Sequence, residues 1–224
     1  MKVEIYTDFS CPFCYLGKKR LEEAIQILKD DIQIELSYRS FILNPNAPLV
    51  QNMDSYTYFS KLKGIPLNQV KDIFLQTKEQ AKKDNLNFNY DVMKMTATTY
   101  AHLIIKSIKE PRMQKEISNL FFKAYFEEGY NLSDLDDLAT ILKPFDLNRN
   151  KIEEIIQHQV AQELLQEDIS LAEAYGIESV PFIIVNDQYA IKGAQPTQVF
   201  KQYLEQIYNN ITEEQHLKND SCSI

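Results

Sequence analysis

The stretch of sequence that decides the fold spans residues 2–16 and reads KVEIYTDFSCPFCYL. Polar and apolar residues alternate at its start, which predicts a strand over 2–7. Beyond Cys14, apolar residues recur every three or four positions, and this spacing predicts a helix that ends near Lys29. A second alternating run predicts another strand over 32–38. Together these segments predict a βαβ unit, whose right-handed crossover makes the two strands parallel.

Two cysteines, Cys11 and Cys14, lie at the junction of this first strand and helix. In the first turn of a helix, residues i and i+3 share a face, so the two thiols can close a small disulfide ring. Unpaired N–H groups at the helix terminus stabilise a thiolate on Cys11, which is therefore the predicted nucleophile. Cys14, one turn further in, is the predicted resolving thiol, which releases the substrate from a mixed disulfide with Cys11.

Two other interpretations of this cysteine pair stay open at this point. A zinc site needs further ligands at suitable spacing, and the only other cysteine is Cys222 near the end of the sequence, with no paired histidines. Two inert core cysteines are the second alternative, although a strand-to-helix turn containing Pro12 is a poor place to bury thiols. We therefore predict no metal site and interpret the pair as redox-active.

The middle of the chain carries helical spacing from about residue 54 to 175. The clearest patterns cover 69–84, 112–127 and 151–175, the last of them broken once, and Ser133 is predicted to cap a further helix. The strand pattern returns afterwards. A hairpin is predicted from two strands over 182–185 and 189–191, followed by a last helix from Pro196.

The dipeptide Val180-Pro181 stands directly before the third predicted strand. Proline cannot donate to a sheet ladder and is tolerated at the first residue of a strand, above all with a cis peptide bond, a form that roughly 5–6% of X-Pro bonds adopt. The backbone beside such a proline can pair with an extended substrate segment. We predict a substrate-binding edge formed by Val180 and Pro181 together with Pro12 and Phe13.

Composition and charge exclude several classes of protein. The 224 residues carry 24 Lys and Arg against 32 Asp and Glu, a formal net charge of −8, so binding to nucleic acid is not expected. No apolar run is long enough to cross a bilayer, and no secretory signal pattern is visible, so we expect a cytoplasmic protein without membrane contact. A glycine-rich dinucleotide fingerprint is absent, so electrons are expected to come from another thiol system.

Several landmarks together resemble the DsbA-like, FrnE-type disulfide oxidoreductases of the thioredoxin superfamily. In family order they are DFSCPFCYLGKKRL (8–21), FILNP (41–45), Ala101-His102, AYFEEG (124–129), GIESVPF (176–182) and GAQP (193–196). The resemblance implies an α/β fold in which an all-helical domain is inserted into a thioredoxin-like domain. The corresponding ranges are 1–52 and 161–212 for the thioredoxin-like domain, 53–160 for the insertion and 213–224 for a flexible polar tail.

This resemblance also implies an activity and a set of site residues. It implies a thiol–disulfide oxidoreductase with Cys11 as nucleophile, Cys14 as resolving thiol and a cis Pro181 beside them. Its substrates are disulfide- or thiol-containing proteins or small molecules. No bound cofactor is implied beyond the redox-active disulfide; a thiol reductant or oxidant system is the partner and glutathione a candidate co-substrate. Phe13 stands where DsbA itself has His, which implies a less oxidising pair, and His102 in the Ala-His element is a candidate site residue.

Two alternative functions share this layout. Kappa-class glutathione transferases and hydroxychromene-carboxylate isomerases have the same insertion architecture and bind glutathione, but they usually carry Ser at the first active position, so Cys14 would have no role. A client-binding chaperone module that uses the cleft between the domains is the non-enzymatic alternative.

Overall fold

The computed structural model describes residues 1–221, and the surroundings of side chains over residues 1–213. In this part of the chain, four strands form one mixed sheet in the order β2-β1-β3-β4. The strands are β1 (Lys2–Thr7), β2 (Glu35–Ser40), β3 (Phe182–Val185) and β4 (Tyr189–Lys192). β1 and β2 are parallel, as the βαβ pattern predicts, and β3 runs antiparallel to both of its neighbours, which confirms the hairpin.

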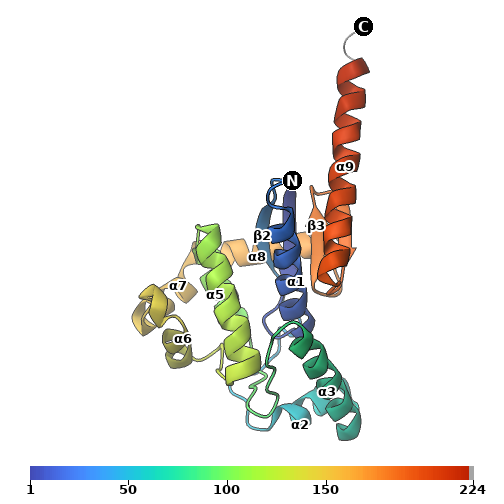
Figure 1. Ribbon diagram of the computed structural model, residues 1–224. Coiled ribbons are helices and arrows are strands. Elements are labelled where there is room, and N and C mark those ends of the chain that lie inside the picture. Colours follow the sequence, from blue (N-terminus) through green and yellow to red (C-terminus); the bar gives the residue numbers. More distant parts are fainter. Residues whose placement is uncertain (222–224) are drawn as a thin grey trace.

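Nine α-helices complete the described fold (Figure 1). They are α1 (Pro12–Leu28), α2 (Ser55–Lys63), α3 (Leu67–Lys83), α4 (Thr99–Ser107), α5 (Pro111–Lys123), α6 (Leu135–Ile141), α7 (Arg149–Gln157), α8 (Gln159–Ala174) and α9 (Thr197–Ser221). A π-helical turn, η1 (Ala124–Glu128), follows α5, and a 3-10 turn, η2 (Lys143–Phe145), follows α6. The predicted start of the insertion at residue 53 falls just before α2, and its predicted end at 160 falls in the first turn of α8.

Two predicted element starts differ from the structure. The second strand starts at Glu35 rather than at residue 32, because the N–H of Ile32 still donates to the Leu28 carbonyl (2.8 Å) at the end of α1. The cap of α6 is Asp134, whose carboxylate accepts two backbone N–H groups, whereas the Ser133 hydroxyl donates to the Ala97 carbonyl.

Two further differences concern helix ends. The helix predicted over 112–127 ends at Lys123, and the chain widens into η1, where the Phe126 carbonyl accepts the N–H of Asn89 (2.7 Å). The last helix continues to Ser221 and projects beyond the sheet (Figure 1), so residues 213–221 are helical where a flexible tail was predicted. Cys222 lies outside the described residues.

The sheet is covered on both faces. α1 and α9 pack on one face, where the core is Val3, Ile5, Leu21, Leu28, Ile183, Phe200 and Leu204. α8 and the segment after it cover the other face, where Tyr6, Phe182 and Ile184 contact Ala172 and Ile177. This arrangement places the start of α1, with its two cysteines, at the carboxyl end of β1.

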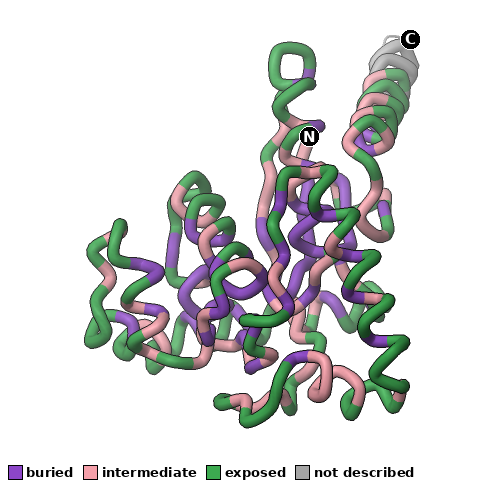
Figure 2. Tube along the Cα trace, turned by 60° about the horizontal axis from the view of Figure 1, so that its bottom comes forward, coloured by how far each residue is buried: buried purple, intermediate pink, exposed green. Residues whose placement is uncertain are grey.

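The helices between β2 and β3 form their own core, and that core continues to the start of α1. One hydrophobic cluster joins Phe9, Cys14, Tyr15 and Leu16 to Phe88, Phe121, Phe122, Phe126 and Leu138 of the helical elements. In Figure 2 the buried residues accordingly concentrate where the sheet and the helices meet. The cysteine pair therefore lies at the junction of the two structural units.

Candidate active site

Cys11 occupies the N-cap position of α1 in an extended conformation (φ −96°, ψ 114°). Its carbonyl accepts the N–H groups of Cys14 (3.0 Å) and Tyr15 (3.3 Å), which starts the helix. Pro12 is the first helical residue, where its missing N–H costs nothing and its fixed φ favours the helix. The Cys11 side chain makes no capping hydrogen bond. Because Cys11 is the N-cap residue, its sulfur lies at the positive end of the helix dipole.

Cys14 lies one turn further along α1 and is completely buried. Both cysteines are free thiols, and 5% of Cys11 is exposed. Burial raises the pKa of the Cys14 thiol well above its ordinary value, and the hydrogen bond and negative charge of Cys11 raise it further. Cys14 is thus held as a neutral thiol behind the more accessible Cys11.

The loop before β3 lies directly against Cys11. The Cys11 Sγ donates a hydrogen bond to the carbonyl oxygen of Val180 (3.5 Å), and the Val180–Pro181 peptide bond is cis. Pro181 is buried, and its carbonyl accepts the N–H of Gly193 (2.9 Å). Phe13, between the two cysteines, is 43% exposed. The structure therefore brings the predicted residues Val180 and Pro181 to Cys11 and leaves Phe13 open to a partner.

Asp8, which sequence reasoning gave no role, anchors the loop that leads into α1. Its buried carboxylate accepts hydrogen bonds from Ser10 N (2.9 Å), Leu43 N (2.6 Å) and the Thr98 hydroxyl (2.8 Å). Burial alone would raise the pKa of Asp8, but the nearby His102 and these N–H donors outweigh it and lower the pKa. An Asp followed two residues later by Ser is a turn signal that could have indicated this anchor.

His102 lies beneath this loop rather than at the sulfur atoms. It is buried, its ring centroid is 4.7 Å from that of Phe9, and its Nε2 is 3.7 Å from Asp8 Oδ1. Within the described residues this Nε2 has no hydrogen-bond partner. The structure thus places His102 next to Asp8, so any influence on the cysteines would pass through that carboxylate.

Aromatic rings enclose the inner side of the cysteine pair. Tyr15 stacks on Phe122 (centroids 5.1 Å, 11° between planes) and on Phe88 (5.7 Å, 19°). Its hydroxyl donates to Glu127 (3.1 Å), and burial first, then the charge of Glu127, raises the pKa of Tyr15. These contacts exclude water from Cys14 on the side of the helical elements.

A cleft of about 200 Å³ opens beside Ser10, between the start of α1, the loop after β2, and α2. Leu43 and Leu62 contribute apolar, partly exposed walls, and the Thr96 hydroxyl at the buried end has no hydrogen-bond partner among the described residues. The cleft therefore offers an apolar surface and a free polar atom beside Ser10, the residue that precedes Cys11.

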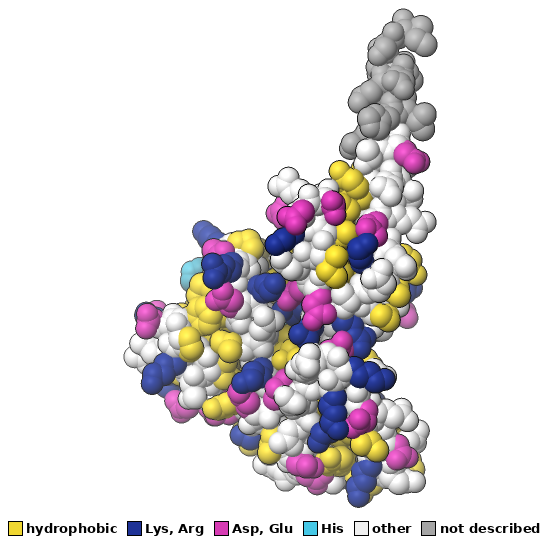
Figure 3. Space-filling model, viewed as in Figure 1, with side chains coloured by type: hydrophobic (Ala, Val, Ile, Leu, Met, Phe, Trp, Pro, Cys, Tyr) yellow, Lys and Arg dark blue, Asp and Glu magenta, His cyan; other side chains and the backbone are white. Residues whose placement is uncertain are grey.

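Surface and ligand features of the described residues are otherwise plain. Charged side chains of both signs are interspersed over the face shown in Figure 3. No group of three or more His, Cys, Asp or Glu within this part of the chain is placed to hold a metal ion. None of its helices combines the length and the apolar character needed to cross a bilayer.

A thioredoxin-type sheet with a Cys-x-x-Cys helix start and an inserted helical block defines the class of this protein. The model of the DSBA-like thioredoxin domain family matches residues 2–205, and the chain belongs to that family. The family resemblance and the α/β fold with a helical insertion are thereby confirmed; the FrnE-type subdivision stays a prediction.

Individual relatives agree with this assignment. YwbO of Bacillus subtilis (strain 168), an uncharacterized protein, is 26% identical over 204 residues, covering 89% of this chain and 93% of its own. A probable DsbA oxidoreductase from Streptomyces coelicolor, SCO1869, superposes with a TM-score of 0.85 at 24% identity, covering 93% of this chain and 90% of its own. The cytosolic disulfide reductase DsbM from Pseudomonas aeruginosa, in a structure with GSH, gives 0.63 at 11% identity, covering 93% and 100%. At these identities the two solved structures show the fold.

Proposed function

We propose that this protein is a thiol–disulfide oxidoreductase in which Cys11 attacks and Cys14 resolves. The observation that carries the proposal is the asymmetry of the two thiols: Cys11 stands at the start of α1 against Val180, and Cys14 is fully buried one turn behind it. The helix dipole and free N–H groups favour negative charge at the first position, and the second is shielded until the first has reacted.

The exchange takes place in two steps. The Cys11 thiolate attacks one sulfur of the substrate disulfide, forming a mixed disulfide and expelling the other substrate sulfur as a thiolate. Cys14 then loses its proton and attacks the Cys11 sulfur, which releases the second substrate thiolate and leaves a Cys11–Cys14 disulfide. Two electrons pass from the dithiol to the substrate, and the two released thiolates take up the two protons. The reverse sequence oxidises a substrate dithiol.

Protein or small-molecule disulfides are the proposed substrates, with a thiol system as the partner that restores the active form. Glutathione is the proposed co-substrate of small size, supported by the DsbM structure solved with GSH and by the cleft beside Ser10. A cytoplasmic location is part of the proposal, because three cysteines in 224 residues do not build the disulfide scaffold typical of small secreted domains. The partly exposed Phe13 and Leu43 offer apolar contact to an extended client chain.

Serine variants test the roles of the thiols. Cys11→Ser should reduce catalysed exchange to the uncatalysed rate, because the accessible active-site thiol is lost and Cys14 is buried, while circular dichroism stays unchanged. Cys14→Ser should accumulate the mixed disulfide, visible by mass spectrometry as substrate attached at Cys11. The matched control, Cys222→Ser, removes the third thiol and should keep the wild-type rate. Full activity in Cys11→Ser, or no Cys11–Cys14 disulfide in any glutathione buffer, would refute the proposal and favour the glutathione-transferase or chaperone alternatives.

The reduction potential tests the direction of electron flow. Phe13 brings no positive charge to the Cys11 thiolate, so the potential should be more negative than the value of about −120 mV known for DsbA. Thiol trapping across glutathione buffers followed by mass spectrometry measures it. A value as oxidising as that of DsbA would contradict this expectation, and one near that of thioredoxin, about −270 mV, would identify a reductase.

A further inference from the structure

Gly17 is the one glycine of this chain that a turn does not explain. The sequence holds five glycines, and four of them, Gly64, Gly129, Gly176 and Gly193, adopt left-handed backbone with φ between 63° and 77°. Gly17 instead lies inside α1, where glycine weakens a helix relative to alanine. A glycine at this position therefore needs a reason other than backbone conformation.

The reason is the close approach of the Val180-Pro181 loop. A Cβ atom at position 17 would lie 2.7 Å from Pro181 Cγ and 3.3 Å from the Cα of Ala194. Ordinary contacts of a Cβ are 3.4 to 4 Å, and a separation under 3.0 Å is not tolerated without movement. The proline ring is stiff and the Ala194 atom belongs to the backbone, so neither can turn aside as a long side chain would.

Hydrogen bonds hold this loop against α1 from the far side. Arg20, one turn after Gly17, donates from Nη1 to the Ala194 carbonyl (2.9 Å), and the Arg20 guanidinium also pairs with Asp84 of the segment after α3 (2.6 Å). Gly193 and Ala194 belong to the segment directly after β4. The Gly193 N–H donates to the Pro181 carbonyl (2.9 Å), so this segment is joined to the Val180-Pro181 loop. With both segments packed against Gly17, the Val180 carbonyl oxygen lies 3.5 Å from the Cys11 sulfur.

We propose that Gly17 is a positioning residue for disulfide exchange: the missing side chain sets the distance at which the Val180-Pro181 loop faces Cys11. The inference rests on the proposed function, because the loop matters as the surface over which a substrate disulfide meets the sulfur. With alanine at position 17, the loop must retreat by several tenths of an ångström. The Cys11 hydrogen bond to Val180 then lengthens, and substrate backbone paired along the loop moves away from the thiolate.

Two consequences can be measured. Misalignment of the substrate should lower kcat/KM for a peptide disulfide at least tenfold in Gly17→Ala, mostly through kcat at a saturating concentration. Loss of the hydrogen bond from the Cys11 thiol destabilises the dithiol relative to the disulfide. The equilibrium constant for exchange with glutathione should therefore shift about threefold toward the Cys11–Cys14 disulfide, an effect that a purely structural role would not produce.

A matched control is available in Gly64→Ala. Gly64 ends α2 with a φ of 66° and has open space where a Cβ would be placed, so alanine there strains the backbone without touching the loop. We expect this variant to lower the thermal midpoint while kcat/KM stays within twofold of the wild type. Gly17→Ala should show the opposite pattern: a folded protein with impaired exchange. Equal impairment of the two variants would overturn the positioning role.

A double variant isolates the contact. Pro181→Ala removes the Cγ atom that a Cβ at position 17 would meet, so the second substitution should reduce the penalty of Gly17→Ala. In the Pro181→Ala background, introducing Ala at position 17 should change kcat/KM less than threefold. A full tenfold loss in that background would contradict the mechanism, as would an unaffected Gly17→Ala single variant beside an active wild type. An inactive wild type would overturn the proposed function itself.

Discussion

Two of the contacts between the helical elements and the thioredoxin-like part of the chain differ in chemistry. Beside the cysteines the contact is aromatic: Tyr15 of α1 stacks on the rings of Phe88 and Phe122, and Glu127 accepts a hydrogen bond from its hydroxyl. This contact contributes by excluding water, and it does so on the side where Cys14 is buried. A neutral thiol is kept neutral by such surroundings.

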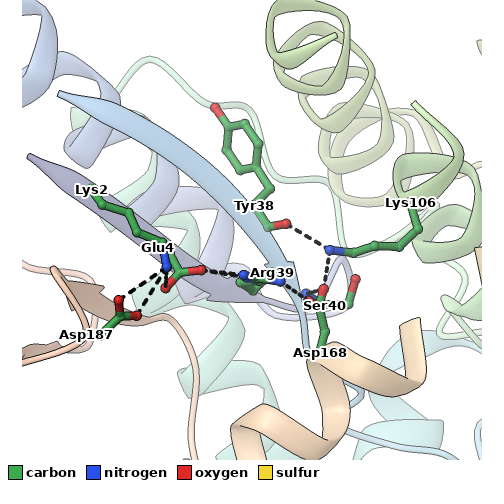
Figure 4. A network of polar contacts seen from close by, with 8 residues as sticks. All are labelled: Lys2, Glu4, Tyr38, Arg39, Ser40, Lys106, Asp168 and Asp187. Atoms are coloured by element: carbon green, nitrogen blue, oxygen red, sulfur yellow. Dashed lines mark hydrogen bonds and ion pairs between the residues drawn. The ribbon is translucent and has the colours of Figure 1, made fainter. Parts of the chain in front are cut away.

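Over the α8 face of β1 and β2 the contact is ionic (Figure 4). Arg39 of β2 pairs with Glu4 of β1 (2.6 Å) and with Asp168 of α8 (2.8 Å), and Asp168 also pairs with Lys106 of α4. The Ser40 N–H donates to Asp168 (2.7 Å), so both oxygens of this buried carboxylate have partners. Lys2 and Asp187 extend the network toward the surface, where the charges stay balanced.

The difference shows a division of tasks between the two contacts. Stacked rings have no fixed register and mainly determine how dry the Cys14 side is. Charged hydrogen bonds are directional, and those of Asp168 fix the end of β2 against α4 and α8. From there the chain runs to Leu43, whose N–H donates to Asp8 beside the cysteines. The aromatic contact therefore sets the environment of the active thiols, and the ionic one sets the position of a neighbouring loop.

Replacing Phe122 by alanine disrupts the aromatic contact and should change stability the most. Phe122 is fully buried and lies within 5.1 Å of Tyr15 and 4.9 Å of Phe9, measured between ring centroids. Phe122→Ala should lower the free energy of unfolding by about 3–5 kcal/mol, because a cavity replaces a packed ring. Cys14 should then be alkylated faster in the folded, reduced protein.

Urea unfolding at low and high salt, with mass spectrometry of iodoacetamide-treated protein, checks this prediction. The loss should be the same at both salt concentrations, because no charge is removed. Ile27→Ala, at an exposed position of α1, is the control and should change neither quantity measurably. Slow alkylation of Cys14 in Phe122→Ala would show that something other than the aromatic contact shields the thiol.

A smaller effect is expected from the ionic contact. Asp168→Asn keeps the shape of the side chain but leaves Arg39 and Lys106 without the charge that both of them face. Hydrogen bonds to charged groups contribute about 1.5–3 kcal/mol each, so a loss of about 2–3 kcal/mol is expected. The relative loss of exchange activity should be smaller than the relative loss of stability, because the substitution leaves the cysteines unchanged.

Equilibrium urea unfolding and the exchange assay measure the two quantities on the same sample. Glu116→Gln is the control, since its ion pair with Arg112 (3.0 Å) is exposed on α5 and such pairs contribute little. An Asp168→Asn protein as stable as the wild type would mean that the network specifies arrangement without adding stability. Equal losses in the two variants would remove the distinction between buried and exposed pairs.

The sequence predicts the βαβ unit and the cysteine site better than it predicts the ionic contact. The alternation over 2–7 and the helical spacing beyond Cys14 predict the βαβ unit, and the Cys spacing locates the site, because these signals repeat over neighbouring residues. Glu4, in contrast, falls on the polar side of the β1 alternation, which suggests exposure to solvent. α8 covers that side of the sheet, so only 2% of Glu4 is exposed, and its buried carboxylate pairs with Arg39.

Asp8 and Gly17 show the same limit at the site. Asp8 acts through Leu43 and Thr98, and Gly17 acts through Pro181, which lies 164 positions away in sequence. Such roles depend on segments that only the folded chain brings together, and periodicity carries no information about them. The cysteines could be predicted because their chemistry is written in their own spacing.

A weaker, pH-dependent effect is expected at Asp8. Burial by itself would raise the pKa of this carboxyl, but His102 and the N–H groups of Ser10 and Leu43 lower it below the ordinary value of about 3.9. A lowered pKa in the folded state stabilises the protein above the unfolded value, and this stability is lost as the pH falls through the folded value. The stability difference between wild type and Asp8→Asn should therefore shrink as the pH falls below about 4.

Unfolding free energies of the two proteins between pH 7 and pH 3 measure this difference, because the other carboxyl groups titrate in both and cancel. His102→Gln provides the matched comparison: it removes the imidazole that lowers the pKa of Asp8, so the folded and unfolded pKa values lie closer together and less stability should be lost on acidification than in the wild type. If the Asp8→Asn difference stays constant over the whole range, Asp8 holds its loop by hydrogen bonds that do not require a charge. Of the two buried carboxylates Asp8 and Asp168, only Asp168 would then contribute through its charge.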